Sequence, residues 1–424
     1  MITTILATIP TLDTGNTAWM MMSTILVLLM SIPGIALFYG GLVRQKNVLS
    51  VVMQTMLIVG AVSLIWVAFG YSWAFDDSYK TSGSPLFFII GGWGKAFLHG
   101  VTTDKLMPTG IPELTFVMFQ CMFALITPAL IIGAFAERIK FKGYMVFTLL
   151  WVIIAYLPMA HWVWGGGFLQ EMGAIDFAGG TVVHINAGVS ALVMALMIGK
   201  REDYRVGHPI TPHNIMFVFL GTSFLWLGWF GFNAGSGLAA DGLDANAFLV
   251  THVATATAAM TWMTVDWCFN KKPTTVGACT GAVAGLVAIT PAAGTVDLLG
   301  AFAIGVITPI VCFIMVAAVK PYFKYDDALD AFGVHGVGGI IGSILTGVFA
   351  TPYITGEGGV EGALYGGWHQ LWVQLVATGV SIVFALVVTT VLFLVVDKTI
   401  GIRVDKRVEE EGLDIYEHGE SAYN

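Results

Sequence analysis

Charge is what this sequence has least of. Only 11% of its 424 residues are Asp, Glu, Lys or Arg, less than half of the ~25% found in soluble domains. Hydrophobic residues make up 57% of the chain and the mean hydropathy is +0.82. A set of ordinary soluble domains is therefore excluded, and a polytopic helical membrane protein is predicted. The net charge of −8 disfavours a nucleic-acid partner, and the aliphatic and aromatic content excludes intrinsic disorder.

Cysteines and enzyme motifs are also scarce. The four cysteines, Cys121, Cys268, Cys279 and Cys312, all lie in apolar stretches, without a CxxC pair or a histidine at zinc-ligand spacing. Buried thiols are expected, with no metal site and no cofactor. The sequence has no HExxH motif, no GxxxxGK[ST] phosphate loop and no polar region large enough for a nucleotide domain, so an enzyme is not expected.

Apolar runs long enough to cross a bilayer, about 20 residues each, dominate the chain. Eleven are predicted, and the odd number places the two termini on opposite sides of the membrane. Their approximate ranges are 18–42, 48–75, 114–136, 143–161, 178–199, 213–236, 245–269, 275–292, 298–319, 332–351 and 370–397.

The basic residues gather in alternate loops. The set that holds 16 of the 19 Lys and Arg residues comprises Arg44, Lys46, Arg138, Lys140, Lys142, Lys200, Arg201, Arg205, Lys271, Lys272, Lys320, Lys324, Lys398, Arg403, Lys406 and Arg407. Because basic loops remain in the cytoplasm, the N-terminus is predicted outside and the C-terminus inside. Residues 1–16 have no basic segment and no cleavage site, so no removable signal peptide is expected.

Two polar segments interrupt or follow the apolar runs. The loop at about 76–113 is expected to be a partly ordered flank of an external vestibule. A membrane domain, residues 1–402, precedes a polar, acidic tail, residues 403–424. The tail is either a solvated disordered end or an ordered regulatory element, with Gly412 and Gly419 as turn points.

Two histidines suggest an internal duplication. His184 and His335 each lie in a Gly-rich apolar run, in the fifth and tenth predicted helices. A five-plus-five repeat, with halves at about 18–199 and 213–351, then has inverted topology, and helix 370–397 is extra. Inverted repeats place the functional site near the membrane midplane, between the halves.

Each of these histidines has two interpretations. A buried neutral imidazole offers one donor and one acceptor, so the pair can bind each other and a small polar solute. Alternatively, each histidine only links helices by hydrogen bonds. Seven nearby glycines permit close helix approach and therefore a narrow conduit; these are Gly179, Gly180, Gly188, Gly333, Gly336, Gly338 and Gly339.

Aspartate and aromatic residues near the outer helix ends form a second candidate site. Asp176 can cap the fifth helix, and its charge can also favour a cation at the outer mouth. Most aromatics at this depth belong to an interfacial belt. An indole face beside a hydroxyl is nevertheless a plausible seat for a small cation. The residues concerned are Phe119, Phe123, Trp164, Phe232 and Ser236.

Five longer motifs resemble the ammonium transporter (Amt/Rh) superfamily, in particular its bacterial Amt branch. The resemblance runs nearly end to end and shows no departure at the site positions. The motifs are IPGIALFYGGLVR at 32–44, DFAGGTVVHINA at 176–187, GWFGFNAGS at 228–236, DDALDAFGVHGVGG at 326–339, and EGLD with HG in the tail at 411–419.

The resemblance implies a homotrimer in a bacterial plasma (inner) membrane, with one pore per protomer. It assigns an external ammonium site to Trp164, Ser236 and Phe123, organised by Asp176. A stacked gate consists of Phe123 and Phe232, with Phe119 and Trp229 flanking the pore, and His184 and His335 line it. The expected partners are ammonium or ammonia, the lipid bilayer and a cytoplasmic PII-type regulatory protein.

The expected function is selective ammonium transport. Ammonium resembles potassium in size and charge but has a removable proton, and neutral ammonia crosses a dry pore at far lower cost than an ion. Whether ammonia crosses alone, or together with a proton relayed by the histidines, stays open. The alternative is an ammonium sensor that signals through its tail, although sensors usually append a signalling domain.

Overall fold

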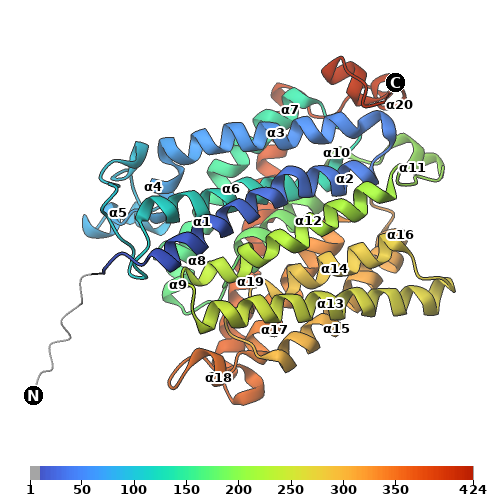
Figure 1. Cartoon of the computed structure of the whole chain (residues 1–424). Helices are drawn as coiled ribbons and strands as arrows, with labels where there is room; N and C mark the ends of the chain where they lie inside the picture. The colour runs from blue at the N-terminus through green and yellow to red at the C-terminus, as the bar shows by residue number, and fades with distance from the viewer. Residues whose placement is uncertain (1–9, 424) are drawn as a thin grey trace, which may run out of the picture.

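The described part of the protein, residues 10–423 of a computed structural model, is a bundle of helices (Figure 1). Over these residues the only β-type contacts are two isolated bridges, Leu106 with Pro112 and Ile139 with Arg403. The predicted all-helical architecture is confirmed. The predicted external terminus and part of the segment examined for a signal peptide lie outside the described residues.

Most of the apolar runs form long helices close to the predicted positions. In chain order the main helices are α1 (Thr14–Leu29), α2 (Ala36–Leu42), α3 (Val48–Ile65), α4 (Tyr71–Phe75), α6 (Glu113–Phe135), α7 (Phe141–Trp151), α8 (Leu157–Trp164), α10 (Asn186–Ile198), α12 (Ile215–Ala234), α13 (Gly242–Asn270), α14 (Thr275–Ile289), α15 (Leu298–Ile314), α17 (Val337–Phe349) and α19 (Trp368–Thr399). Shorter helices at the bundle ends are α5 (Ser78–Thr81), α9 (Phe168–Glu171), α11 (Glu202–Val206), α16 (Lys320–Phe323), α18 (Pro352–Thr355) and α20 (Lys406–Glu411).

Wider π-helical turns join several of these helices into continuous rods. Two of them contain the candidate histidines: His184 lies in the turn Gly180–Ile185, which leads into α10, and His335 lies in Phe332–Gly336, which leads into α17. Such π-turns interrupt the regular ladder and are frequent at functional sites.

Within residues 10–423, ten helical segments are long and apolar enough to cross a membrane. The run predicted at 275–292 is the exception, because α14 has 15 residues and ends before Pro291. The short helix lies inside the bundle: α14 packs against α12, α13, α15 and α17, and its second half is buried. An apolar run thus predicts burial correctly here, while helix length depends on a proline.

Glycine allows the two histidine-bearing segments to touch. A Cβ atom on Gly188 of α10 would lie 2.1 Å from the backbone nitrogen of Gly336. A Cβ atom on Gly339 of α17 would lie 2.9 Å from the Cβ of His184. These approaches are shorter than any side chain tolerates, so the predicted role of glycine in close helix contact is confirmed at these positions.

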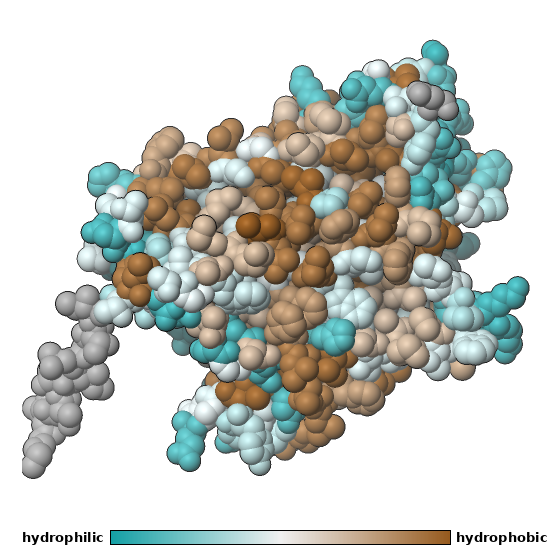
Figure 2. Space-filling model, in the orientation of Figure 1, coloured by the Kyte–Doolittle hydropathy of each residue, from teal (hydrophilic) through white to brown (hydrophobic). Residues whose placement is uncertain are grey.

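The bundle has two polar ends separated by an apolar band (Figures 1 and 2). We call the end with α11, α16 and α20 the C-terminal end, and the end with α5, α9 and α18 the N-terminal end. Lys80, Lys95 and Lys105 form ion pairs with Glu171 or Glu113 near the N-terminal end. The arginine clusters described below lie at the C-terminal end, in agreement with the predicted partition of basic residues.

The loop between α4 and α6 is ordered and lines the N-terminal end. The backbone nitrogen of Gly94 donates to Asp76 Oδ2 at 2.6 Å, and the Ser72 hydroxyl donates to the Gly92 carbonyl at 2.9 Å. Its residues Met107, Pro108 and Thr109 form part of a cavity wall. The loop therefore flanks a cavity, while its predicted external location stays a prediction.

The tail is folded and docked, so the disordered interpretation is wrong for residues 403–423. The Asp414 carboxylate accepts hydrogen bonds from the backbone nitrogens of Leu49 (3.0 Å) and Ser50 (2.8 Å), in the first turn of α3. Leu413 is fully buried, and Glu417 accepts from the backbone nitrogen of Phe141 at the start of α7, at 2.8 Å. Two helix starts thus depend on tail carboxylates.

Gly412 allows the tail to approach the loop that contains Lys46. Gly412 has φ +121° and Gly419 has φ +70°, so both predicted turn points are confirmed. A Cβ atom on Gly412 would lie 2.7 Å from the Lys46 side chain and 2.8 Å from its carbonyl oxygen, whereas Gly419 has open space.

Candidate functional site

A cavity of about 350 Å³ opens at the N-terminal end of the bundle. It is lined by Phe123, Trp164 and Ser236, three of the predicted site residues, and by Gln120 and Phe177 among others. The ring centroids of Phe123 and Trp164 are 5.7 Å apart and the rings are nearly perpendicular, at 85°. We call this cavity the outer cavity, and none of the described residues that line it carries a formal charge. Aromatic faces and polar oxygens therefore dominate its surface.

Ser236 presents an acceptor to the outer cavity. Its hydroxyl donates to the carbonyl oxygen of Phe232, one helical turn earlier, at 2.8 Å. The proton is used by that bond, so the lone pairs of the hydroxyl oxygen are left for a donor in the cavity. An N–H group is such a donor.

Two stacked phenyl rings close the floor of the outer cavity. The centroids of Phe123 and Phe232 are 4.4 Å apart with 25° between the ring planes, and both side chains are buried. Phe119 packs edge-on against Phe123 at 5.0 Å. The predicted gate residues are thus in contact, with Phe119 beside them.

The two histidines lie below the phenyl stack. The His184 ring is 6.2 Å from Phe232, and the centroids of His184 and His335 are 5.5 Å apart with ring planes 12° from parallel. Both side chains are buried. No hydrogen bond joins the rings: both nitrogens of His184 and Nδ1 of His335 lack a partner among residues 10–423. The expectation that the pair binds each other is therefore not met.

Trp229, which the resemblance places beside the pore, packs against His184. Its ring is 5.4 Å from His184 and nearly parallel to it, at 12°. Its indole N–H donates to the Thr290 hydroxyl, at 2.8 Å, in the turn after α14. This buried bond fixes the indole and leaves its face against the imidazole.

Asp176 caps a helix and does not line the outer cavity. Its two carboxylate oxygens accept hydrogen bonds from the backbone nitrogens of Gly179, Gly180, Thr181 and Val182, at 2.5–3.0 Å, and from the Thr181 hydroxyl. The capping interpretation is confirmed. The Asp176 carbonyl also accepts the Trp164 indole N–H at 2.8 Å, so this residue positions the indole.

A second capping aspartate escaped the sequence interpretation. The Asp327 carboxylate accepts from the backbone nitrogens of Ala331 (3.1 Å) and Phe332 (2.8 Å), at the start of the His335 segment. Asp176 and Asp327 each precede their histidine by eight positions. This shared spacing is the signal that could have revealed the second cap.

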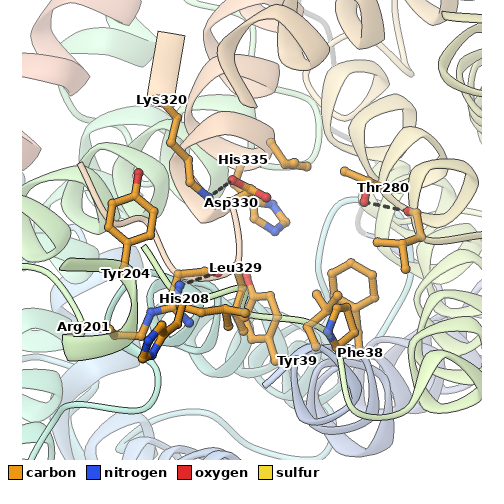
Figure 3. Close-up of a pocket in the computed structure, with 16 residues that line it drawn as sticks. Phe38, Tyr39, Arg201, Tyr204, His208, Thr280, Lys320, Leu329, Asp330 and His335 are labelled. Carbon is orange, nitrogen blue, oxygen red and sulfur yellow. Dashed lines mark hydrogen bonds and ion pairs between the residues drawn. The ribbon is translucent and has the colours of Figure 1, made fainter. Parts of the chain in front are cut away.

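The histidine column ends in an inner cavity of about 400 Å³ at the C-terminal end (Figure 3). His335 lies in its wall, together with Lys320, Asp330, Arg201 and Tyr39. The buried phenyl and imidazole rings therefore separate two cavities. No predicted site residue other than His335 lines the inner one.

A buried ion network supports the inner cavity. The Arg201 guanidinium is 2.8 Å from a carboxylate oxygen of Glu137 and 2.8 Å from one of Asp326, and Arg44 also binds Glu137, at 3.0 Å. Burial alone would raise the pKa of Asp326, but Arg201 and Arg138 hold it down to about 2. The same carboxylates raise the pKa of Arg201 despite its burial.

These features define a multi-pass helical membrane protein with a narrow, buried column between two cavities. The chain belongs to the Ammonium Transporter Family, whose model matches residues 18–423.

Individual relatives agree with this membership. A protein named ammonium transporter from Aquifex aeolicus is 49% identical over 414 residues, which cover 97% of this chain and 94% of that protein. The crystal structure of Mep2 from Saccharomyces cerevisiae is similar with a TM-score of 0.84 at 36% identity, covering 93% of this chain and 88% of that one. A structure named Sensor Amt Protein has a TM-score of 0.86 at 31% identity, covering 95% and 98% of the chains.

Proposed function

We propose that this protein transports ammonium selectively across the plasma membrane of a bacterium. The observation that carries the proposal is the buried column of Phe123, Phe232, His184 and His335 between an uncharged aromatic cavity and an inner cavity. The names of relatives such as the ammonium transporter of Aquifex aeolicus support the same function.

The outer cavity suits a small cation with N–H donors. The Trp164 and Phe123 rings offer π-faces to the positive charge, and Ser236 Oγ offers a hydrogen-bond acceptor. Asp176 contributes indirectly, because its carbonyl oxygen accepts the indole N–H of Trp164 and so positions the ring. Potassium can share the attraction to the rings but cannot donate a hydrogen bond.

The column favours ammonia over any ion. Phe123 and Phe232 are almost completely buried, and an unpaired charge between them would be heavily penalised. Ammonium can lose a proton at the outer cavity and continue as a neutral molecule, an option that potassium lacks.

The histidines then receive the neutral molecule. Both nitrogens of His184 and Nδ1 of His335 have no partner in the described part of the chain, so they are free to hydrogen-bond a small solute. The proton either stays outside, which makes transport electroneutral, or follows the imidazoles separately, which makes it electrogenic.

We extend the proposal to topology and assembly. The C-terminal end is cytoplasmic, because it holds the arginine network and the basic loops. Eleven spans, with α14 as the short one, form inverted halves at about 18–199 and 213–351; the equal spacing of Asp176–His184 and Asp327–His335 supports this repeat. The family resemblance supports a homotrimer and a PII-type protein that binds the cytoplasmic face.

The second candidate is an ammonium sensor that signals through its tail. Two observations support a sensor: the similarity to a structure named Sensor Amt Protein, and the docking of the tail on the starts of α3 and α7. A sensor without transport would bind ammonium in the outer cavity and produce no flux.

Flux measurement separates these functions. We expect purified protein in proteoliposomes to give a saturable current or internal pH change when ammonium is added, and none with potassium at equal concentration. Ammonium binding without current or pH change would favour the sensor. Equal responses to both cations would contradict selective transport.

A further inference from the structure

We propose that Lys320 is a tethered cation that occupies the only carboxylate among the described residues lining the inner cavity, so that this cavity binds ammonium more weakly than the outer one. The inference rests on the proposed function, and it adds a residue that makes ammonium recognition unequal on the two sides of the membrane.

The two cavities differ in charge. The outer cavity is lined by uncharged residues, whereas the charged residues that line the inner cavity are Arg201, Lys320 and Asp330. Arg201 forms ion pairs with Glu137 and Asp326, which are not among the lining residues. The inner cavity therefore has one carboxylate that could attract ammonium, and a lysine already binds it.

Lys320 is held by two oxygens. Its Nζ lies 2.5 Å from Asp330 Oδ1 and 2.8 Å from the carbonyl oxygen of Asp327. Only 15% of the Lys320 side chain and 28% of the Asp330 side chain are exposed. Figure 3 shows the Lys320–Asp330 contact close to His335.

The corresponding position at the outer cavity holds an aromatic residue. There the carbonyl of Asp176, eight residues before His184, accepts the indole N–H of Trp164 at 2.8 Å. At the inner cavity the carbonyl of Asp327, eight residues before His335, accepts the Lys320 ammonium at the same distance. One end thus presents a π-face to an arriving cation, and the other presents a positive charge.

A lysine ammonium is the closest chemical analogue of the transported ion. Lys320 satisfies the Asp330 carboxylate and repels a second cation. Ammonium should consequently saturate the inner side only at high concentration. Because the outer cavity lies beyond the buried column, its half-saturation should not depend on Lys320.

The test compares the two directions of transport in oriented membrane vesicles. Uptake of radiolabelled methylammonium is measured in right-side-out and inside-out vesicles, which load the outer and inner cavities respectively. Lys320→Met removes the charge, Lys320→Arg keeps it as the matched control, and Lys320→Met with Asp330→Asn removes both charges.

For the wild type we expect the half-saturation concentration to be about tenfold higher from the inner side, as expected for one partly screened charge interaction. Lys320→Met should lower the half-saturation concentration from the inner side about three- to tenfold by freeing the Asp330 carboxylate. The half-saturation concentration from the outer side should stay within about twofold of the wild type. Lys320→Arg should resemble the wild type. The double variant should show little of this decrease in the inner half-saturation concentration, because Asp330→Asn removes the carboxylate.

Several outcomes would overturn the inference. They are equal half-saturation on both sides of the wild type, an unchanged inner value in Lys320→Met, or an equal gain in the double variant. If Lys320→Met does not assemble, Asp330→Asn alone serves, because it leaves Lys320 uncompensated and should raise the inner value further. Absence of wild-type uptake from either side would instead contradict the proposed function.

Discussion

At the scale of single residues, Trp164 tests the outer cavity. Trp164→Leu removes the indole face, and a cation–π contact is worth about 0.5–2 kcal/mol. The apparent affinity for ammonium should therefore weaken about 2- to 30-fold in proteoliposome transport, with a smaller change in maximal rate. Trp93→Leu is the matched control, since Trp93 is half-exposed at the same end and absent from the cavity wall. Identical saturation in both variants would reduce Trp164 to an interfacial aromatic.

The histidines separate a conduit from a structural pair. His184→Leu and His335→Leu delete the ring nitrogens, so an electrogenic relay should fail and the current per folded protein on a solid-supported membrane should collapse. No hydrogen bond joins the two rings, so neither substitution should orphan its neighbour, and assembly should be preserved.

His252→Leu is the control for this experiment, because His252 is exposed on α13 and outside the column. Full current in both column variants would contradict a proton relay while leaving ammonium transport intact. Lower protein stability with full current would instead favour a purely structural role.

The sequence marks His184 directly, because an ionisable residue in a Gly-rich apolar run is a candidate functional residue. The grouping of Phe123, Phe232 and Trp229 with it comes from the resemblance of the long motifs to the ammonium transporter family. Lys320 could not be placed in this way, because its role depends on a loop that carries Asp330 back to it. Hydropathy identifies a lysine near a helix end as an interfacial residue and does not report its partner.

At the scale of elements, Arg201 connects three segments of the C-terminal end. Arg201→Ala leaves Glu137 and Asp326 buried with fewer partners, and loss of one member of a buried ion pair costs about 3–5 kcal/mol. The unfolding temperature of Arg201→Ala in detergent should therefore be markedly lower than that of the wild type. Arg205→Ala breaks an exposed pair with Glu202 and should have a much smaller effect, because exposed ion pairs contribute little to stability. Equal losses would contradict the importance of this network.

The same network gives a pH dependence with a definite sign. The pKa of Asp326 in the folded protein is about 2, below the ~3.9 of an unfolded aspartate. Its stabilising contribution is therefore fully present above about pH 4 and lost as the pH falls toward 2. The difference in unfolding temperature between the wild type and Asp326→Asn should shrink across that interval.

Helix positions were easier to predict than helix ends. Hydropathy located the run at 18–42, but α1 begins at Thr14 because Asp13 accepts the backbone N–H of Asn16 at 2.8 Å. The π-turns around His184 and His335 were missed as well. A hydropathy pattern reports which residues avoid water, and a one-residue change in winding barely alters it.

At the scale of the whole molecule, the tail links loops that are far apart in sequence. Deleting residues 404–424 removes the carboxylates that cap α3 and α7, so transport should fall while the bundle stays folded. Transport in proteoliposomes and monodispersity on gel filtration measure the two effects. Unchanged transport together with unchanged PII binding would leave the tail without a regulatory role.

Two glycine variants refine this prediction. Gly412→Ala keeps every other tail residue but places a Cβ against Lys46 at φ +121°, whereas Gly419→Ala has open space and the less strained φ of +70°. We expect the first to reproduce much of the truncation's effect and the second to reproduce little of it. The opposite order would place the important contact elsewhere in the tail.

Docking of the tail also has a consequence for biosynthesis. Asp414 and Glu417 leave the ribosome after every long helix has been made, yet they supply the acceptors for Leu49, Ser50 and Phe141, which were made early. The backbone amides at the starts of α3 and α7 therefore lack these protein acceptors until residues 414–417 have been made. Hydrogen exchange at these amides should slow only after residues 414–417 have been made, so these amides report whether the tail of a newly inserted chain has docked.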